Sequence, residues 1–447
     1  MKFADICKEK WFFWKYNLVK PGATAYFAKM KADQYRSPEE IEALNWERTK
    51  KILRYAWEHV PYYRKRFEAE GMTPDDIRTP EDFEKVPLLT RKDLTENFSK
   101  LLSDEATLRD VRISTTGGSS GTPAKVYHQK SVVRAAAGWR MLDWWNISPA
   151  ANWASVYRDV CPTFKAKVIH FLEWFPTWQL LLNATSFTER DMLVFLRQFQ
   201  KRRPQLLHGY VGAIDVLAQY MLDRGISVPA PKAIWVTSAP ITPVQQNRIE
   251  KAFGAPVYDQ YGCCEMYWLA AECAARRGLH MFYDIRRFEF LDENHHRVPD
   301  GEYGDIVITD LENYYFPLIR YVNGDRGRRL PGVCSCGCNL PLMDKVKGRV
   351  SESFVLPSGT RLNGEFLTTI FDSCPEVVKQ FQVHQRKDRS IEILVVPSDS
   401  PLREKVFQEV CEDLRKKCNH EVPVELKEVA EIPLRKGKLK YIISDAD

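Results

Sequence analysis

A run of small and hydroxyl-bearing residues from Thr115 to Lys125 constrains this chain more than any other feature. It reads Thr-Thr-Gly-Gly-Ser-Ser-Gly-Thr-Pro-Ala-Lys and lacks the side chains needed to pack a core. The alternating stretch 111–114 before it is typical of the end of a β-strand. Glycines let the backbone close around an anion, and N–H and hydroxyl groups can hold phosphate oxygens. The run therefore predicts either a phosphate-binding loop or a surface turn, and it lacks the Gly-Lys-Ser/Thr ending of a Walker P-loop.

Later segments favour the phosphate-binding alternative. In 257–265, an apolar run, a tyrosine and a glycine precede a glutamate that could face Mg²⁺, which prefers oxygen ligands. In 315–325, an apolar strand ends at Gly-Asp, where a carboxylate can accept hydrogen bonds from both ribose hydroxyls. In 432–441, a basic loop could bring an ammonium to a phosphate or carboxylate. Each segment alone also fits a turn or a solvated basic face, but their joint occurrence in this order argues against coincidence.

With these segments the chain resembles the adenylate-forming superfamily, specifically its phenylacetate–CoA ligase-like branch. Within that branch it is most similar to the CapK-like, or coenzyme F390 synthetase-like, proteins. The resemblance extends over nearly the whole chain, from 53–64 and 86–94 to Gly437-Lys438. It implies an α/β fold with a large multi-layered domain, 1–349, that binds ATP and the acyl group. A small mobile α+β domain, 350–447, would carry the catalytic lysine.

The resemblance also implies a role for each motif residue. Tyr261 and Gly262 would border the adenine and the acyl group, and Glu265 would help to hold Mg²⁺. Asp325 would bind the ribose hydroxyls, and Arg349 would contact the ribose or a phosphate. The loop that binds the phosphates of ATP would consist of Thr115, Thr116, Gly117, Gly118, Ser119, Ser120, Gly121 and Thr122.

Departures from the family pattern leave some assignments open. The family's small-residue–Glu-Pro turn reads Ser-Ala-Pro around Ala239, so its glutamate is missing. The basic C-terminal loop is one residue shorter than usual. Lys438 is the expected catalytic lysine of adenylation, with Lys436 and Lys440 as alternatives. The interdomain hinge falls near Ser351, and no hinge residue is assigned.

A predicted metal site lies among the nucleotide motifs. Cys334 and Cys336 belong to a Cys-x-Cys-Gly knuckle that can present two thiolates to one ion, and Cys273 and His280 lie upstream. Three sulfurs and one nitrogen would form a closed tetrahedral zinc site, which is typical of a structural role. Members of the resembled branch show this arrangement. Cys338 is an alternative ligand. The other possibility is that these residues bind no metal and are ordinary buried or surface side chains.

Composition narrows the class of protein. The length of 447 residues predicts more than one domain, and 44% hydrophobic with 28% charged residues is typical of a soluble globular protein. A net charge of +6, with both signs spread throughout, argues against a nucleic-acid binder. Eleven cysteines without a secretory signal indicate reduced thiols in the cytoplasm. No segment predicts a transmembrane helix, whereas the aromatic-basic segment 10–16 predicts either peripheral membrane contact or a helix packed on its own domain.

Periodicity indicates the organisation. Residues 1 to about 110 are predicted to be mostly helical, and about 111–350 alternate short apolar strands with amphipathic helices. In the last part, 378–384, 390–396 and 422–426 are predicted strands, and 402–418 is a predicted helix. The oligomeric state does not follow from these patterns.

The implied reaction is ATP-dependent activation of a carboxylic acid as an acyl-adenylate, with release of pyrophosphate, then transfer to an acceptor. ATP, Mg²⁺, structural Zn²⁺ and CoA are the expected cofactors, with the CoA thiol as the expected acceptor. One alternative acceptor is an amine, such as that of a sugar in capsular or exopolysaccharide biosynthesis. An alternative of another class is a non-catalytic adenylate-binding scaffold. Tyr210, Trp144 and Trp145 are candidates for the acyl pocket, and the alternative is that they fill the core, as most aromatic side chains do.

Overall fold

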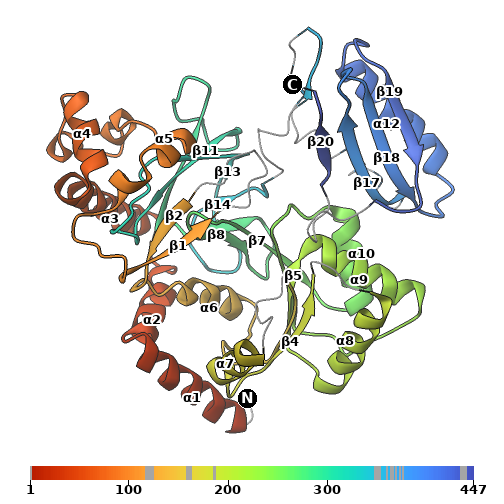
Figure 1. Ribbon diagram of the computed structural model, residues 1–447, viewed down its shortest axis with the longest axis horizontal. Coiled ribbons are helices and arrows are strands. Elements are labelled where there is room, and N and C mark those ends of the chain that lie inside the picture. The colour runs from red at the N-terminus through yellow and green to blue at the C-terminus, as the bar shows by residue number, and fades with distance from the viewer. Residues whose placement is uncertain are drawn as a thin grey trace. The chain divides into compact units, whose positions relative to one another are not determined.

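In a computed structural model (Figure 1), the chain folds into two compact units. The first unit comprises 1–149 and 260–346, and the second comprises 150–259 and 347–447. The predicted division into 1–349 and 350–447 stays a prediction. The structure describes residues 3–115, 125–157, 164–184, 188–346, 354–358, 361–362, 367, 370–371, 374, 377–432 and 440–446.

The first unit opens with helices, as the apolar periodicity predicts. Helix α3 (Pro38–His59) begins at Ser37, whose side chain accepts a hydrogen bond from the N–H of Glu40 while the Glu40 carboxylate accepts from the N–H of Ser37. The remaining helical elements here are α1 (Phe3–Val19), α2 (Ala23–Asp33), α4 (Pro61–Ala69), η1 (Pro74–Asp76), η2 (Asp82–Lys85), α5 (Arg91–Glu96), η3 (Phe98–Leu101) and α6 (Ala135–Trp144).

Strands of the first unit are antiparallel. Strand β1 (Val111–Thr115) pairs with β2 (Lys125–Gln129), so these strands flank the predicted phosphate-binding loop in sequence. A three-stranded sheet has the order β10 (Arg286–Leu291), β11 (Gly304–Asp310), β12 (Tyr321–Gly327). The end of β7 (Val257–Cys263) continues in the pairing order β8 (Tyr267–Glu272), β9 (Leu279–Met281), β14 (Leu342–Met343), β13 (Arg329–Leu330).

The core of the first unit joins distant parts of the sequence. Phe83 and Val86 from its helical start share one buried apolar cluster with Phe288, Ile308 and Tyr321 from the later sheet. Segments on either side of the insertion 150–259 therefore stabilise one another by burying apolar surface.

The second unit begins with the predicted alternation of strands and helices. Its parallel strands have the order β4 (Gln179–Asn183), β3 (Trp153–Tyr157), β5 (Leu206–Tyr210), β6 (Ala233–Thr237), and the first residues of β7. The helices between them are α7 (Phe164–Trp174), α8 (Glu189–Arg202), α9 (Val211–Asp223) and α10 (Pro243–Phe253). The strands share a buried apolar cluster with α8, α9 and α10, as expected of α/β layers.

The last part of the chain has its own sheet and apolar core. Its strand order is β19 (Val424–Glu428), β18 (Ile391–Pro397), β17 (Val378–Gln385), β20 (Ile442–Ser444), and α12 (Arg403–Lys417) packs on it. Two short strands, β15 (Phe354–Val355) and β16 (Arg361–Leu362), pair with each other. The predicted strands and helix of this part are confirmed to within a few residues.

Candidate nucleotide and metal sites

The Tyr-Gly-Cys-Cys-Glu motif forms the sharp turn from β7 into β8. The pairing of these strands is irregular between Tyr261 and Gly262. A Cβ atom on Gly262 would lie 2.1 Å from the carbonyl oxygen of Tyr267, so this close approach requires glycine. Tyr267 has a φ of 62°, a strained value for a residue with a side chain. Arg286 Nη2 donates to the carbonyl oxygen of Met266 at 2.9 Å and thereby supports the turn.

Strand β12 brings the predicted ribose ligand to the motif tyrosine. The Tyr261 hydroxyl donates to Oδ2 of Asp325 at 2.7 Å, and Asn323 Nδ2 donates to the same oxygen at 3.3 Å. The Asn323 side-chain oxygen accepts from the N–H of Asp325 at 3.0 Å. Burial, followed by the charge of Asp325, raises the pKa of Tyr261 well above its usual range, so the hydroxyl keeps its proton. These contacts fix the orientation of the carboxylate.

Glu265 lies in the same unit, with only 4% of its surface exposed. The Tyr321 hydroxyl donates to its Oε1 at 3.2 Å. Burial, and then the charge of Glu265, raise the pKa of both Tyr321 and Cys263 above their usual ranges. Cys263 is therefore a protonated thiol and does not have the lowered pKa of a nucleophilic cysteine. The oxygen donors of Glu265 suit Mg²⁺.

His128 of β2, which no sequence motif predicted, lies against this turn. Its ring centroid lies 4.5 Å from that of Tyr267, and the side chain is 2% exposed. Burial, and next the charge of Arg134, lower the pKa of His128 to about 3, so the ring is neutral near pH 7. Its Nε2 has no hydrogen-bond partner among the described residues. A lone histidine in a strand carries no motif, so only its position just after the Ser/Thr/Gly run could have drawn attention to it.

A small pocket lies beside the turn. The Arg134 guanidinium stacks over the Tyr267 ring at 4.2 Å from its centroid. Arg286 donates to both Asp310 and Glu312 at 2.9 Å, which compensates its charge. The residues that line this pocket are Met30, Val133, Arg134, Ala137, Tyr267, Trp268, Ile285, Arg286 and Glu312.

A second small pocket lies in the other unit, at the carboxyl ends of β5 and β6. Ligands of α/β proteins bind preferentially at such strand ends. The pocket contains Tyr210, one of the three predicted acyl-pocket residues, and Ala239, where the family turn would have its glutamate. Its lining residues are Tyr210, Val211, Gly212, Thr237, Ser238, Ala239, Gln245 and Tyr441.

Several predicted site residues lie outside the described part of the chain. Thr115 ends β1, whereas the rest of the loop, 116–122, is not described, and neither are Arg349, Lys436 and Lys438. Lys440 is described, and its carbonyl oxygen accepts from Gln382 Nε2 at 2.7 Å. The roles of the loop, Arg349 and the lysine therefore stay predictions.

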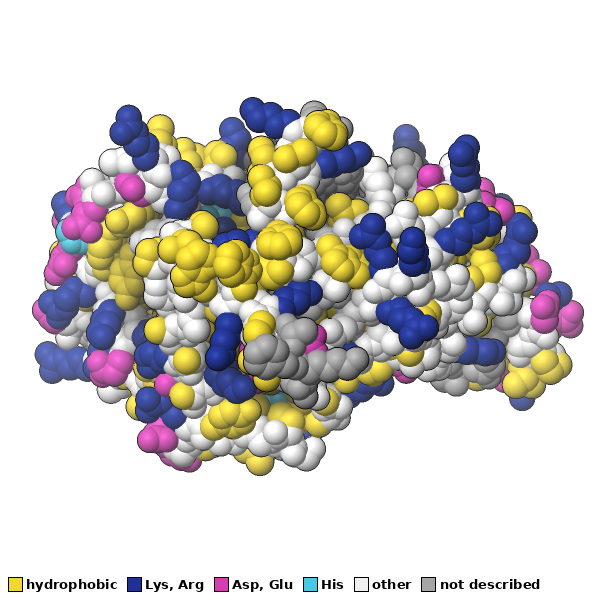
Figure 2. All heavy atoms as spheres, turned by 90° about the horizontal axis from the view of Figure 1, so that it is seen from below, with side chains coloured by type: hydrophobic (Ala, Val, Ile, Leu, Met, Phe, Trp, Pro, Cys, Tyr) yellow, Lys and Arg dark blue, Asp and Glu magenta, His cyan; other side chains and the backbone are white. Residues whose placement is uncertain are grey.

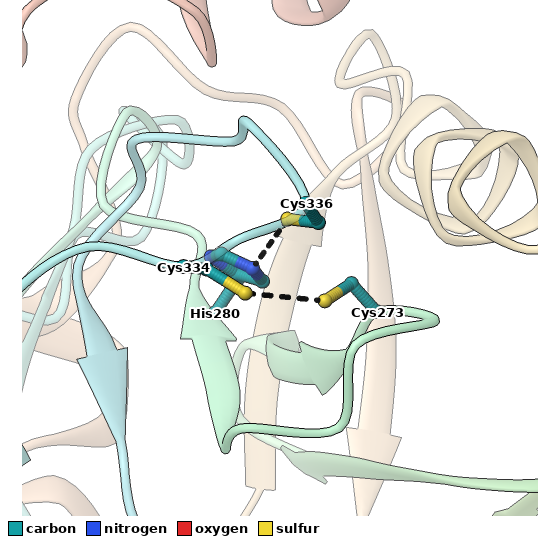
Figure 3. A group of neighbouring side chains, drawn as sticks. All are labelled: Cys273, His280, Cys334 and Cys336. Carbon is teal, nitrogen blue, oxygen red and sulfur yellow. Dashed lines mark hydrogen bonds between the residues drawn. The ribbon is translucent and has the colours of Figure 1, made fainter.

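The predicted zinc ligands come together (Figure 3). The side chains of Cys273, His280, Cys334 and Cys336 point toward one another, and their ligand atoms all lie within 4.8 Å of each other. The Sγ atoms of Cys273 and Cys334 are 3.6 Å apart, and Cys336 Sγ lies 3.3 Å from His280 Nε2. Two sulfurs bound tetrahedrally to one zinc ion would be about 3.7 Å apart. The spacing of this cluster therefore fits zinc.

Neighbouring groups orient the zinc cluster. His280 is fully buried, and its Nδ1 contacts the carbonyl oxygen of Leu340 at 3.0 Å, which directs Nε2 toward the sulfurs. Hydrogen bonds from Cys338 lower the pKa of the Cys336 thiol to about 4, which favours the thiolate that a metal needs. The Trp144 ring lies 5.2 Å from that of His280, and Trp145 Nε1 donates to the carbonyl oxygen of Glu272 at 2.9 Å. The structure thus places these two tryptophans near the Cys/His cluster.

Comparison with solved structures identifies the fold. The chain has the fold of adenylate-forming ligases. It matches 2-hydroxyisobutyryl-CoA ligase in the postadenylation state with a TM-score of 0.74 and 21% identity, over 91% of this chain and 90% of that chain. It also matches the amide bond synthetase McbA from Marinactinospora thermotolerans with a TM-score of 0.50 and 15% identity, over 76% of this chain and 68% of that chain. The predicted fold class, with a separate C-terminal sheet domain, is confirmed.

Sequence comparison then points to one branch of that class. The chain is 24% identical over 396 residues to phenylacetate-coenzyme A ligase of Thermus thermophilus, covering 84% of this chain and 85% of that protein. It is 22% identical over 306 residues to Protein CapK of Staphylococcus aureus, covering 67% of this chain and 65% of that protein. Residues 354–445 match the family model of the CapK C-terminal domain. These likenesses confirm the resemblance to the phenylacetate–CoA ligase-like and CapK-like branch.

Proposed function

We propose that this protein is an AMP-forming ligase that activates a carboxylic acid with ATP and transfers the acyl group to the thiol of CoA. The observation that carries the proposal is the arrangement of Tyr261, Asp325 and Glu265. Within one unit, the Asp325 carboxylate is held by Tyr261 at one end of the 261–265 motif, and the buried Glu265 carboxylate lies at the other end. The first suits ribose hydroxyls and the second suits Mg²⁺.

The proposed reaction has two steps. A carboxylate oxygen of the acid attacks the α-phosphorus of ATP, the bond between that phosphorus and the bridging oxygen breaks, and pyrophosphate leaves. The CoA thiolate then attacks the acyl carbon, and AMP leaves with the bonding electron pair. The protein contributes mainly positioning and charge neutralisation. Asp325 would hold the ribose, Glu265 would hold Mg²⁺, the loop 115–122 would hold the phosphates, and Lys438 would bridge the reacting carboxylate and phosphate.

Arg134 and His128 are our candidates for contacts to the acid. A carboxylic acid must reach the turn that carries Glu265 before it can react. Arg134 supplies a positive charge on the Tyr267 ring, and His128 supplies a neutral ring nitrogen without a partner among the described residues. These groups suit a carboxylate better than an apolar wall would, because burying an anion requires charge or hydrogen-bond compensation.

An amine is the second candidate acceptor. The match of 354–445 to the CapK C-terminal domain model favours it, because the small domain presents the acceptor after adenylation in the proposed mechanism. The acceptor would be an amino sugar or a similar amine. A non-catalytic adenylate-binding scaffold is the alternative of another class, and the alanine at position 239 motivates it.

The Cys/His cluster is proposed to bind a structural zinc ion. With four protein ligands such a site is closed, so the metal would stabilise the fold around β9 and the 334–336 knuckle and would take no part in the reaction. No helix in the described ranges combines the length and apolarity needed to cross a membrane.

The test mixes purified protein with Mg·ATP, hydroxylamine and a panel of aryl, fatty and amino acids. Pyrophosphate, AMP, ADP and hydroxamate are measured together, and CoA or amino sugars then replace hydroxylamine. Acid-dependent pyrophosphate and hydroxamate are expected, followed by acyl-CoA. Formation of an amide but no thioester would select the amine. Binding of ATP without turnover across the panel would favour the scaffold, and formation of ADP and phosphate would overturn adenylation.

A further inference from the structure

Helix α7 carries a stripe of large apolar side chains on its surface. Phe164, Val168, Phe171 and Leu172 of the helix, and Phe175 directly after it, expose between 42% and 83% of their surface. They follow positions i, i+4, i+7, i+8 and i+11, which lie within about 100° of one another around a helix. Exposure of single apolar residues is ordinary, but a contiguous stripe of phenylalanine and leucine indicates a binding surface.

A neighbouring flank of α7 contacts the rest of its unit. The Trp174 ring lies 5.4 Å from that of Trp153 in β3, and the His170 ring lies 5.6 Å from that of Trp174 within the same helix. At helical spacing Trp174 lies outside the stripe, so this contact anchors the helix while the stripe stays exposed.

Lysines border the stripe on both sides. Lys165 and Lys167 are both exposed, and at helical spacing they lie on opposite flanks of the apolar positions. Figure 2 shows one face of the molecule on which exposed apolar side chains lie among lysines and arginines. An apolar stripe bordered by lysines is typical of a helix that lies in the interface of a membrane, where the long lysine stems let the ammonium groups reach the headgroups.

Helix α1 in the other unit has a second surface of the same chemistry. Trp11, Trp14, Leu18 and Val19 expose between 46% and 74% of their surface, and the exposed Lys10 lies beside them. Its other side packs on its own unit, where Phe12, Phe13 and Tyr16 surround the ring of Trp139. The two alternatives predicted for segment 10–16 are thus compatible, since one side packs and the other is exposed.

We propose that the protein docks on an anionic lipid surface through α7. Charge complementarity favours a lipid surface over a second copy of the chain as the binding partner of α7. Lysines on both flanks suit phosphate headgroups, whereas a second copy of the same helix would bring Lys165 and Lys167 against their own counterparts. Phenylalanine, tryptophan and leucine suit the boundary between headgroups and acyl chains.

The experiment measures sedimentation of the full chain with vesicles. One set contains phosphatidylcholine alone, and the other contains phosphatidylcholine with phosphatidylglycerol. Binding to the mixed vesicles is expected, with a loss as salt rises and much weaker binding to phosphatidylcholine alone. The double variant Lys165→Gln/Lys167→Gln should weaken binding by about fivefold per lysine. Phe171→Gln/Leu172→Gln should weaken it at least as much.

Val194→Gln is the matched control, because Val194 is 48% exposed on α8 and lies outside both helices. Its binding should equal that of the wild type, and circular dichroism checks that every variant is folded. The proposal is overturned if the wild type does not bind the mixed vesicles, or if the Phe171/Leu172 variant binds as well as Val194→Gln. Self-association that is lost in the Phe171/Leu172 variant, without vesicle binding, would instead assign the stripe to a second copy. None of these outcomes depends on the ligase activity.

Discussion

Replacing Tyr261 by phenylalanine tests whether the Tyr261–Asp325 contact prepares the site for ribose. The change removes a donor that lies 2.7 Å from Oδ2 of Asp325 and leaves the ring in place. A hydrogen bond to a charged group contributes about 1.5–3 kcal/mol, and each 1.4 kcal/mol is a tenfold change in affinity. Asn323 still reaches the same oxygen at 3.3 Å and compensates in part. We therefore expect about tenfold weaker nucleotide binding.

The assay is isothermal titration calorimetry with a nonhydrolysable ATP analogue, which needs no knowledge of the acid. The same titration with an analogue lacking both ribose hydroxyls should show little difference between wild type and Tyr261→Phe, because the carboxylate then has no hydroxyls to hold. Tyr63→Phe is the control. Its buried hydroxyl donates to the carbonyl oxygen of Pro317 at 3.0 Å, so this variant loses stability but not nucleotide affinity.

Two results would refute the reasoning. Wild-type affinity in Tyr261→Phe would mean that the contact does not orient Asp325 for the nucleotide. Equal losses with and without ribose hydroxyls would mean that Tyr261 acts elsewhere, for instance on the base. Because the raised pKa keeps Tyr261 protonated, the loss should be the same from pH 6 to pH 9.

Other expected outcomes concern the metal, a buried histidine and the lysine. Cys334→Ser should lower bound zinc, measured by mass spectrometry, and should lower the free energy of unfolding by more than about 2 kcal/mol; full zinc content in this variant would contradict the site. His128 has a pKa of about 3 when folded, below its ordinary 6.5, so its contribution to stability is present above pH 6.5 and is lost as the pH falls toward 3. Between pH 6.5 and pH 3 the free energy of unfolding, measured with urea, should therefore fall by up to about 5 kcal/mol less in His128→Gln than in the wild type. Parallel pH profiles of the two proteins would contradict this explanation. Lys438→Ala should abolish pyrophosphate release with ATP binding retained, whereas Lys440→Ala should remain active; the reverse pattern would move the assignment to Lys440.

Local patterns sufficed to predict much of the fold. The alternation at 111–114 predicts a strand that the structure extends to Thr115, and the helical spacing of the N-terminal part is confirmed. Strand and helix positions after 377 follow from periodicity because each element buries one face. The Cys334–Cys336 knuckle is likewise a local signal that predicts metal binding. The fold supplies the rest of the cluster by bringing Cys273 and His280 close to the knuckle.

The long-range contacts within the site could not be predicted from sequence patterns. Tyr261 and Asp325 are separated by 64 residues, and their hydrogen bond depends on how β7 and β12 lie in the folded unit. His128 has no motif, and its low pKa comes from burial and then from the charge of Arg134, both of which depend on the fold. The structural requirement for Gly262 comes from the carbonyl oxygen of Tyr267, which no periodicity reveals.

The insertion of 150–259 between the two halves of the first unit has a consequence for biosynthesis. Asn45 donates to the carbonyl oxygen of Tyr283, a partner 238 residues further along the chain. At a translation rate of about 5–20 residues per second, the nascent N-terminal helices wait roughly 10–50 seconds for the strands that complete their core. During that interval their apolar faces are available to chaperones, and a fragment that ends at residue 149 should remain incompletely folded on the ribosome.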